Sequence, residues 1–178
     1  MPNPNPDAFQ FLATRRSRPA KTLGLPIPDR ATLLPMLEAA VRTPDHGKLE
    51  PWRLIVLPEA ALQRLAQAVP AAGARLGQPQ DKIDKMQKQF ADGQLAVCVV
   101  ESPKASDKIP PLEQTYSAGA VCLALLNAAL ASGWGANWLS GWASHDPEFC
   151  ADHLGLAPHE RMAGFIHIGT ETSAPPER

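Results

Sequence analysis

Apolar residues along this chain recur either at the i, i+3, i+4 spacing of helices or in the short continuous runs of buried strands. Residues Asp7 to Thr14 predict a first helix, because Phe9, Leu12 and Ala13 share one face and Asp7 suits its N-cap. The other helices predicted in this way are one ending near Arg42, Pro58 to about Val69, the polar and exposed segment Pro79 to Ala91, Pro111 to Ser132, and Asp146 to Leu154.

Strands are predicted at Trp52 to Leu57, Leu95 to Val100, Ala136 to Leu139 and Met162 to Ile168. The run at 95–100 is apolar at every position, which indicates a central strand covered on both faces. Helices and strands are mixed without a strict βαβ alternation. We therefore expect an α+β fold in three layers, with about four strands in its sheet.

Two features of the predicted helices allow two interpretations each. The second helix starts after Asp29 or after Thr32, and the later start would place Pro35 in the first turn, where proline is tolerated. The long helix carries alanines at four-residue intervals from Ala120 to Ala128. This stripe either lets another backbone approach closely, as at a dimer interface, or packs in an ordinary core.

The composition places the chain among ordinary globular proteins. Its 178 residues, 44% hydrophobic and 20% charged, predict one domain over 1–178, with a flexible N-terminus at 1–6 and a short C-terminal tail at 171–178. The net charge of −1 argues against general binding to nucleic acid or to a membrane surface.

Targeting signals and cysteines point to the cytoplasm. No apolar run approaches the roughly 18 residues of a membrane span, and the N-terminus lacks the apolar region of a signal peptide. Cys98, Cys122 and Cys150 are widely spaced, which indicates reduced thiols, mostly in the core. We therefore expect a cytoplasmic protein.

The segment Arg15-Arg16-Ser17-Arg18 concentrates cations and a hydroxyl directly after the first helix. Guanidinium groups bind phosphate through paired charge-assisted hydrogen bonds, and a serine hydroxyl can add another. Such a cluster suits one phosphate monoester better than a long polyanion. The alternative is a solvated basic turn, and a small nucleic-acid-binding domain is disfavoured by the near-neutral charge.

The link from Thr43 to Trp52 is too polar to be a plain connector, and its glycine permits unusual backbone angles. A metal site of Asp45, His46 and Glu50 is weakly supported, because no second cluster of His or Cys completes a shell. A nucleophile activated by His46, either Ser17 or a cysteine, has equally little support. A loop that lines a ligand pocket is the better functional interpretation.

The segment Trp134 to Trp142 holds three of the four tryptophans together with two glycines. Aromatic surface beside exposed backbone suits a planar ring system, although a Trp-rich core strand would give the same pattern. Glu113, Gln114 and Ser117 either face the same pocket or support the start of the long helix. The other histidines show no ligand spacing and are expected to be structural or at the surface: His145, His153, His159 and His167.

Several motifs follow one another between about residues 7 and 170. They are Arg15-Arg16-Ser17, Arg42-x-Pro44-Asp45-His46, Pro51-Trp52, Glu113-Gln114-x-x-Ser117-Ala118-Gly119-Ala120, Trp138-x-Ser140-Gly141 and Gly164-Phe165-Ile166-x-Ile168-Gly169-Thr170. None is specific alone. In this order and spacing the chain resembles the nitroreductase family of FMN-dependent oxidoreductases, most closely a short bacterial subgroup.

The resemblance implies a three-layer α-β-α flavoprotein with a mostly antiparallel central sheet, assembled as a homodimer with FMN between the subunits. The residues that it assigns to FMN are Arg15, Arg16, Ser17, Arg42, His46, Trp138, Leu139 and Ser140. The first three would hold the phosphate and ribityl chain, the next two would reach across from the partner subunit, and the last three would lie along the isoalloxazine or ribityl chain.

The chemistry implied by the resemblance is carried by the flavin, so no catalytic residue and no metal are expected from the protein. NADH or NADPH would deliver hydride to FMN. A nitroaromatic, quinone or related small acceptor would then take the electrons, in a pocket built from a variable segment, here Ala72 to Gln94.

The chain departs from the family pattern at two positions. Leu139 stands where close relatives carry Arg, which puts the pyridine-nucleotide preference in doubt. Glu50 replaces a usual Gln, and a carboxylate near a flavin would disfavour its anionic reduced form, unless it faces away. Leu139 and the short C-terminus motivate an alternative, a flavin-binding sensor or store with little turnover. The terminal Arg178 could approach the phosphate.

Overall fold

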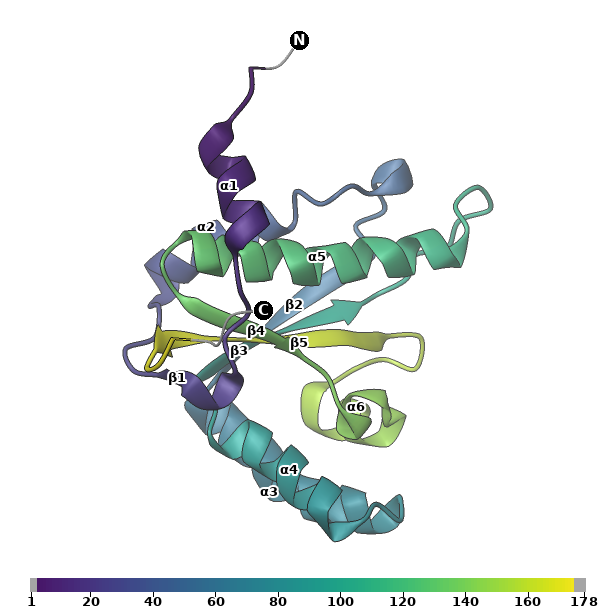
Figure 1. Cartoon of the computed structure of the whole chain (residues 1–178). Helices are drawn as coiled ribbons and strands as arrows, with labels where there is room; N and C mark the ends of the chain where they lie inside the picture. Colours follow the sequence, from purple (N-terminus) through teal and green to yellow (C-terminus); the bar gives the residue numbers. More distant parts are fainter. Residues whose placement is uncertain (1–2, 175–178) are drawn as a thin grey trace.

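The structure, a computed structural model, describes residues 3–174. Helices cover both faces of a central sheet (Figure 1). The helices are α1 (Pro6–Thr14), α2 (Arg30–Ala40), α3 (Glu59–Arg75), α4 (Gln80–Ala91), α5 (Pro111–Ala131) and α6 (Pro147–Leu154), with 3-10 turns η1 (Ala20–Thr22), η2 (His46–Lys48) and η3 (Trp142–His145). The strands are β1 (Leu23–Gly24), β2 (Trp52–Pro58), β3 (Leu95–Glu101), β4 (Gly135–Leu139) and β5 (Arg161–Glu171).

The sheet runs in the order β1-β5-β3-β2, and β4 also pairs with β5. Each of these pairings is antiparallel, as the resemblance implied. Every residue of β3 is buried, which confirms the central position predicted for its apolar run.

Two apolar cores lie on opposite faces of the sheet. In β3, Val97 and Val99 pack with α2 and α5, whereas Ala96 and Cys98 pack with α3, α4 and α6. Successive strand residues point to opposite faces, so one fully apolar strand serves both cores. This arrangement confirms the three-layer α-β-α prediction.

Several predicted boundaries were wrong. Helix α3 continues past Pro70 to Arg75, although the sequence had suggested an end near Val69. The strand predicted at 162–168 extends to Glu171, so part of the expected tail belongs to β5, and β1 was not predicted at all. Strand β1 pairs antiparallel with the end of β5, with Leu23 opposite Glu171. This end of β5 lies beyond the residues that pair with β3.

The structure decides where α2 starts and corrects the predicted N-cap of α1. Asp29 caps α2, its Oδ1 accepting from the Thr32 N–H at 2.8 Å, so Pro35 lies inside the helix. Helix α1 is capped by Asn5 and not by Asp7. Helix α4 is less exposed than predicted, because Ile83, Met86 and Phe90 are buried.

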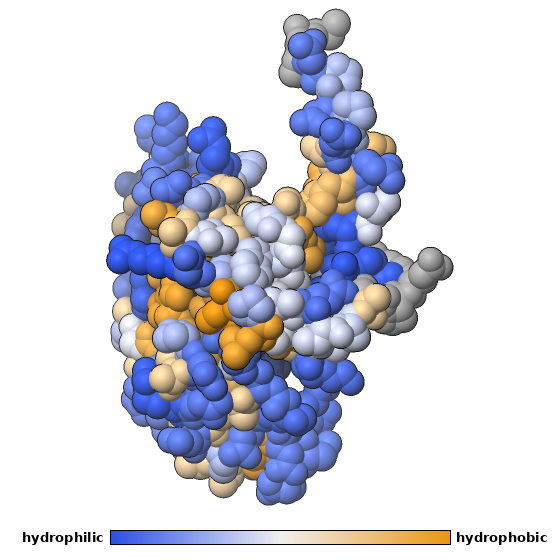
Figure 2. Space-filling model, turned by 90° about the vertical axis from the view of Figure 1, so that its left-hand side faces the viewer, coloured by the Kyte–Doolittle hydropathy of each residue, from blue (hydrophilic) through white to orange (hydrophobic). Residues whose placement is uncertain are grey.

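Helix α1 stands away from the rest of the molecule (Figures 1 and 2). None of its residues is buried, and Phe9 and Leu12 are 74% and 58% exposed. Such a short helix is marginal in water without tertiary packing. Its apolar side chains are therefore available for a contact that a single copy of residues 3–174 does not make.

Helix α5 crosses the sheet and packs against α2. It is the one helix within 3–174 that is long and apolar enough to cross a membrane, and its packing in the core accounts for that composition. Ala124 and Ala128 pack partly against this core. The outer side of α5 carries exposed Leu112, Tyr116 and Leu123.

Candidate cofactor-binding site

The basic segment begins where α1 ends. Arg15 has an extended backbone (φ −55°, ψ 148°), and its N–H closes the last helical turn on the Phe11 carbonyl at 2.8 Å. The side chains of Arg15 and Arg16 are half-buried, and Ser17 is exposed. Within residues 3–174, neither guanidinium group makes a hydrogen bond or an ion pair with protein. Two cations that are neighbours in the sequence thus have no protein partner in this part of the chain.

Arg18 attaches this segment to the outer edge of β4. Its N–H donates to the Ala136 carbonyl at 2.8 Å, and its own carbonyl accepts from Asn137 Nδ2 at 2.7 Å. The guanidinium group forms an ion pair with Glu171. The chain therefore docks the last residue of the basic segment, Arg18, on the start of the Trp-rich strand.

Strand β4 presents Trp138, Leu139 and Ser140 at its end. The indole of Trp138 lies across Gly164, where an added Cβ would come within 2.0 Å of Nε1, and it donates to the Ala163 carbonyl at 3.3 Å. Trp138 remains 38% exposed, Leu139 is half-buried and Ser140 is exposed. In residues 3–174 no strand pairs with the outer edge of β4, which leaves backbone donors and acceptors for a planar ligand.

The α4 side of the site contains part of the segment 72–94. Trp142 Nε1 donates to the Lys82 carbonyl at 3.3 Å, and Gly141 packs so closely on Met86 that a Cβ would lie 2.8 Å from its sulfur. Helix α4 therefore borders the turn that follows Ser140.

The loop with Arg42 and His46 is held by the start of α5. His46 Nδ1 lies 2.6 Å from Glu113 Oε2, and Ser117 Oγ donates to the Pro44 carbonyl at 3.0 Å. Arg42 and His46 are both exposed. Glu113 and Ser117 thus support this loop, while Gln114 exchanges two hydrogen bonds with the backbone of Lys104.

The same loop has an unusual backbone. Gly47, Lys48 and Glu50 have φ values of 79°, 54° and 48°. Left-handed angles are uncommon for residues other than glycine and persist where the surroundings fix them. Here the Asp45 carboxylate accepts from the Glu50 N–H at 2.7 Å, so Asp45 stabilises the turn.

A single copy of the chain does not bring all the candidate residues together. Helix α5 is about 30 Å long at roughly 1.5 Å per residue. The His46 loop lies at its first turns, whereas Arg18 is attached to β4, which follows its last turn (Figure 1). Arg15, Arg16 and Ser17 therefore lie toward one end of α5, and Arg42 and His46 lie toward the other. Trp138, farther along β4, contacts Ala163, which shares a pocket with Thr115 of α5.

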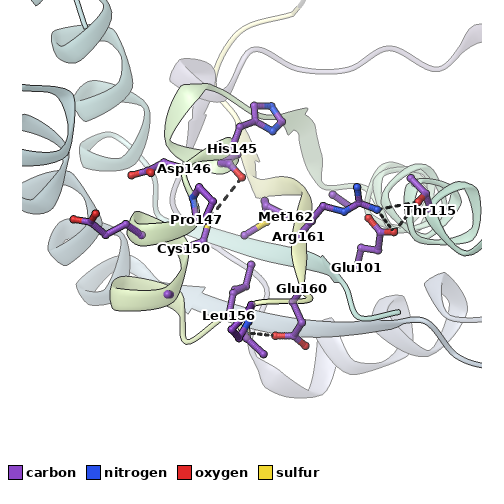
Figure 3. A pocket seen from close by; sticks show the side chains of 17 residues that line it. Glu101, Thr115, His145, Asp146, Pro147, Cys150, Leu156, Glu160, Arg161 and Met162 are labelled. Atoms are coloured by element: carbon purple, nitrogen blue, oxygen red, sulfur yellow. Dashed lines mark hydrogen bonds and ion pairs between the residues drawn. The ribbon is translucent and has the colours of Figure 1, made fainter. Parts of the chain in front are cut away.

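A pocket of about 830 Å³ lies between α5, the start of β5 and the η3–α6 segment (Figure 3). At one side the buried Glu101 accepts hydrogen bonds from Thr115 at 2.6 Å and from Arg161 at 2.8 Å. Met162, Ala163 and Leu156 contribute apolar surface. Because Trp138 contacts Ala163, the pocket borders the β4 part of the candidate site.

Metal and nucleophile interpretations gain no support. In the described part of the chain, no three His, Cys, Asp or Glu side chains are grouped to hold a metal ion. All three cysteines are buried, as predicted, and burial raises the pKa of Cys122 to about 12 and of Cys150 to about 11. Thiolates, the reactive form, are therefore disfavoured.

Among the other histidines, His167 is buried in β5 and His145 lies exposed at the pocket. His153 and His159 are exposed. Arg178 lies outside the described residues.

The donor set fits FMN. A phosphate monoester needs closely placed cations and hydroxyl donors, which Arg15, Arg16 and Ser17 can supply, since their side chains have no partner within 3–174. A flat ring system needs aromatic surface and backbone groups along one edge, and Trp138 with the outer edge of β4 provides both.

The chain belongs to the nitroreductase family, since residues 12–170 match the family model described as "Nitroreductase family". It is 30% identical over 164 residues to "Putative NAD(P)H nitroreductase YdjA" of Escherichia coli K12, covering 92% of this chain and 88% of that protein. A Haemophilus influenzae Rd protein that is also named as an NAD(P)H nitroreductase is 32% identical over 166 residues, with the same shares covered.

Solved structures share the fold. A nitroreductase-like family protein from Bacillus cereus superposes with a TM-score of 0.78 at 21% identity, covering 100% of this chain and 92% of that one. An FMN-dependent nitroreductase from Clostridium difficile R20291 gives a TM-score of 0.68 at 18% identity, with 94% and 89% covered.

Proposed function

We propose that this chain is an FMN-dependent oxidoreductase that takes hydride from NADH or NADPH and passes electrons to a nitroaromatic, quinone or related small acceptor. The observation that carries the proposal is the pair of half-buried guanidinium groups, Arg15 and Arg16, without a protein partner in 3–174 and next to a segment docked on β4. The relatives' names support the same chemistry, with NAD(P)H in the Escherichia coli protein's name and FMN in the Clostridium difficile protein's.

Each part of the candidate site has a separate task in this proposal. Arg15 and Arg16 neutralise the phosphate, and the Ser17 hydroxyl donates one more hydrogen bond. Trp138 and Leu139 give the ring system an apolar surface, and backbone groups of β4 bind its polar edge. When bound, FMN supplies the hydride and electron transfer, while the protein orients it and excludes water.

We propose further that two copies of the chain form a homodimer and complete the site between them. Arg42 and His46 lie at the start of α5, whereas the Arg15 segment is attached to the strand that follows its end, so a second copy would bring the two together. The exposed apolar residues Phe9 and Leu12 of α1, together with those on the outer side of α5, offer surface for such an interface.

A second candidate function is a flavin-binding protein with little turnover. Leu139 favours it, because it places an apolar side chain where the resemblance leads us to expect a cation for the nicotinamide or flavin. The two candidates differ in one measurable step, the reduction of bound flavin by NADH or NADPH.

An absorbance spectrum tests the proposal directly. Purified protein should show the visible bands of bound flavin, and anaerobic NADH or NADPH should bleach them rapidly. Bound flavin that resists both nucleotides would favour the sensor or store. Protein that stays colourless after incubation with FMN would contradict both candidates.

Two further expectations belong to this proposal. We expect one domain over 1–178, and limited proteolysis of the purified protein should yield one resistant core. The cytoplasmic location is expected from the sequence features above, and fractionation of the source cells would test it.

A further inference from the structure

Arg18 differs from its two basic neighbours because its polar groups are occupied. Its Nε lies 2.5 Å from Glu171 Oε2, and its Nη1 donates to the Arg16 carbonyl at 2.8 Å. Its backbone N–H and carbonyl are bonded to Ala136 and Asn137 in β4. The side chains of both members of the pair are largely covered, 22% exposed for Arg18 and 28% for Glu171.

Glu171 holds this arginine from a fixed position. It is the last residue of β5 and lies opposite Leu23 in the antiparallel pair. The next residue, Thr172, donates its N–H to the Thr22 carbonyl at 2.9 Å. The connection from residue 18 to residue 23 is thus bonded at both ends to neighbouring strands.

The packing around Arg18 is equally specific. A Cβ on Gly135 would lie 3.4 Å from Cγ of Arg18 and 2.5 Å from Cδ2 of Leu23. The stem of Arg18 is therefore in van der Waals range of the start of β4, beside the Leu23 side chain, which fills the space that only a glycine leaves open. Within residues 3–174 the guanidinium groups of Arg15 and Arg16 make no hydrogen bond or ion pair, so their donors remain for a ligand.

We propose that the Arg18–Glu171 ion pair is a positioning device for the phosphate site. It fixes the Arg16 carbonyl and the backbone of residues 16–18 against β4, so that Arg15, Arg16 and Ser17 meet the phosphate in a preformed arrangement. This inference rests on the proposed function. Preorganisation of this kind raises affinity because less conformational freedom is lost on binding.

A direct role for Arg18 makes the opposite prediction about Glu171. If Arg18 were itself a phosphate ligand, Glu171 would compete with the phosphate, and removing its negative charge would tighten binding. If Arg18 positions the segment, Glu171→Ala weakens binding although a negative charge has been removed.

The experiment compares dissociation constants for FMN and for riboflavin, which lacks the phosphate, by quenching of flavin fluorescence. We expect Glu171→Ala and Arg18→Ala each to weaken FMN binding roughly tenfold and to leave riboflavin binding nearly unchanged. The double variant should be no weaker than either single one, since both changes break one device. Arg18→Lys should behave like Arg18→Ala, because an ammonium group cannot reproduce the fork that bonds Glu171 and the Arg16 carbonyl together.

Controls separate this inference from the proposed function. Glu59→Ala removes an exposed carboxylate at the start of α3 and should change neither constant. Arg15→Ala should weaken binding of FMN but not of riboflavin. If it does not, the assignment of the phosphate site itself is wrong. If it does, while Glu171→Ala tightens FMN binding or leaves it unchanged, only the positioning role is overturned. If the variants lose riboflavin affinity as strongly as FMN affinity, the defect is a general structural one, and the positioning role is overturned as well. If Glu171→Ala does not fold, Glu171→Gln takes its place.

Discussion

His167 lies in the middle of β5 with its ring on the side of the α3–α4 layer, 2% exposed. Its Nε2 has no hydrogen-bond partner within residues 3–174, and its Nδ1 would lie 3.3 Å from a Cβ on Gly93. Burial alone lowers the pKa of His167 from 6.5 to about 4. The charged imidazolium is thus disfavoured in the folded protein.

This histidine should make stability depend on pH. Between about pH 6.5 and 4 the unfolded chain binds a proton at this residue that the folded protein does not. The free energy of unfolding is therefore highest above pH 6.5 and falls toward pH 4, by up to about 1.4 kcal/mol per pH unit.

Urea unfolding at a series of pH values tests the prediction. His167→Gln should remove the slope between pH 6.5 and 4.5, whatever it does to absolute stability. The exposed His159→Gln should retain it. Hydrogen bonds from Arg53 are the chief reason that the pKa of Glu160 is lowered to about 2. Protonation of Glu160 therefore lowers the free energy of unfolding only below about pH 4.5, and it does so equally in all variants. An unchanged slope in His167→Gln would refute the assignment.

At single residues, local chemistry was readable from the sequence and long-range pairing was not. Adjacent cations and a hydroxyl made the segment 15–18 a candidate phosphate site, and the family resemblance then selected Arg15, Arg16 and Ser17 from it. Nothing nearby indicated that Arg18 pairs with Glu171, because that partner is 153 positions away and was predicted to lie in a tail. Asn137, which holds the Arg18 carbonyl, was likewise hidden in a segment noted for its tryptophans.

Helix α3 shows how an element can override a local signal. Pro70 cannot donate to the Ala66 carbonyl, and its ring disfavours the preceding turn, so the sequence suggested an end at Val69. The helix nevertheless continues, because Ala72 and Gly73 are buried beyond it. A Cβ on Gly73 would lie 2.5 Å from Ile83, so α4 packs directly on this last part. Tertiary packing thus outweighs the proline.

Replacing Pro70 should therefore stabilise the protein. Pro70→Ala restores the donor to the Ala66 carbonyl, and we expect the free energy of unfolding to rise by about 2 kcal/mol, after the greater freedom of the unfolded chain is subtracted. Denaturant unfolding measures this. Pro147→Ala is the matched control, because Pro147 is the first residue of α6, where a proline removes no helical bond. Equal effects of the two changes would contradict the explanation.

The predicted and observed elements differ where only three-dimensional pairing decides. Strand β1 has two residues inside a proline- and glycine-rich connection, and it exists because β5 extends far enough to pair with it. In contrast, β3 and α5 could be predicted from the sequence alone, because their own long apolar patterns specify them. The same reasoning explains why the two parts of the candidate site could be listed from the sequence but not placed.

On the scale of the whole molecule, the proposed dimer means that one chain would carry two halves of different sites. Arg15 and Arg16 would supply one half, and Arg42 with His46 would supply the other, because the two pairs lie toward opposite ends of α5. A two-fold interface makes each contact twice. A dimer in which α5 and α1 are covered would therefore contain two equivalent sites, each drawing one half from each subunit.

Mixed dimers test this sharing. One variant carries Arg15→Ala and Arg16→Ala, and the other carries Arg42→Ala and His46→Ala. Each alone should bind FMN weakly, because both of its sites lack a half. In a dimer of one copy of each, one site has lost both halves and the other is intact. Random pairing after co-expression should therefore restore about a quarter of the wild-type FMN sites, half of the dimers having one good site of two. Flavin content per chain, measured after gel filtration, reports this fraction.

If all the residues acted within a single chain, co-expression would restore no FMN binding. Independently of any variant, light scattering that shows an FMN-loaded monomer would contradict the shared site.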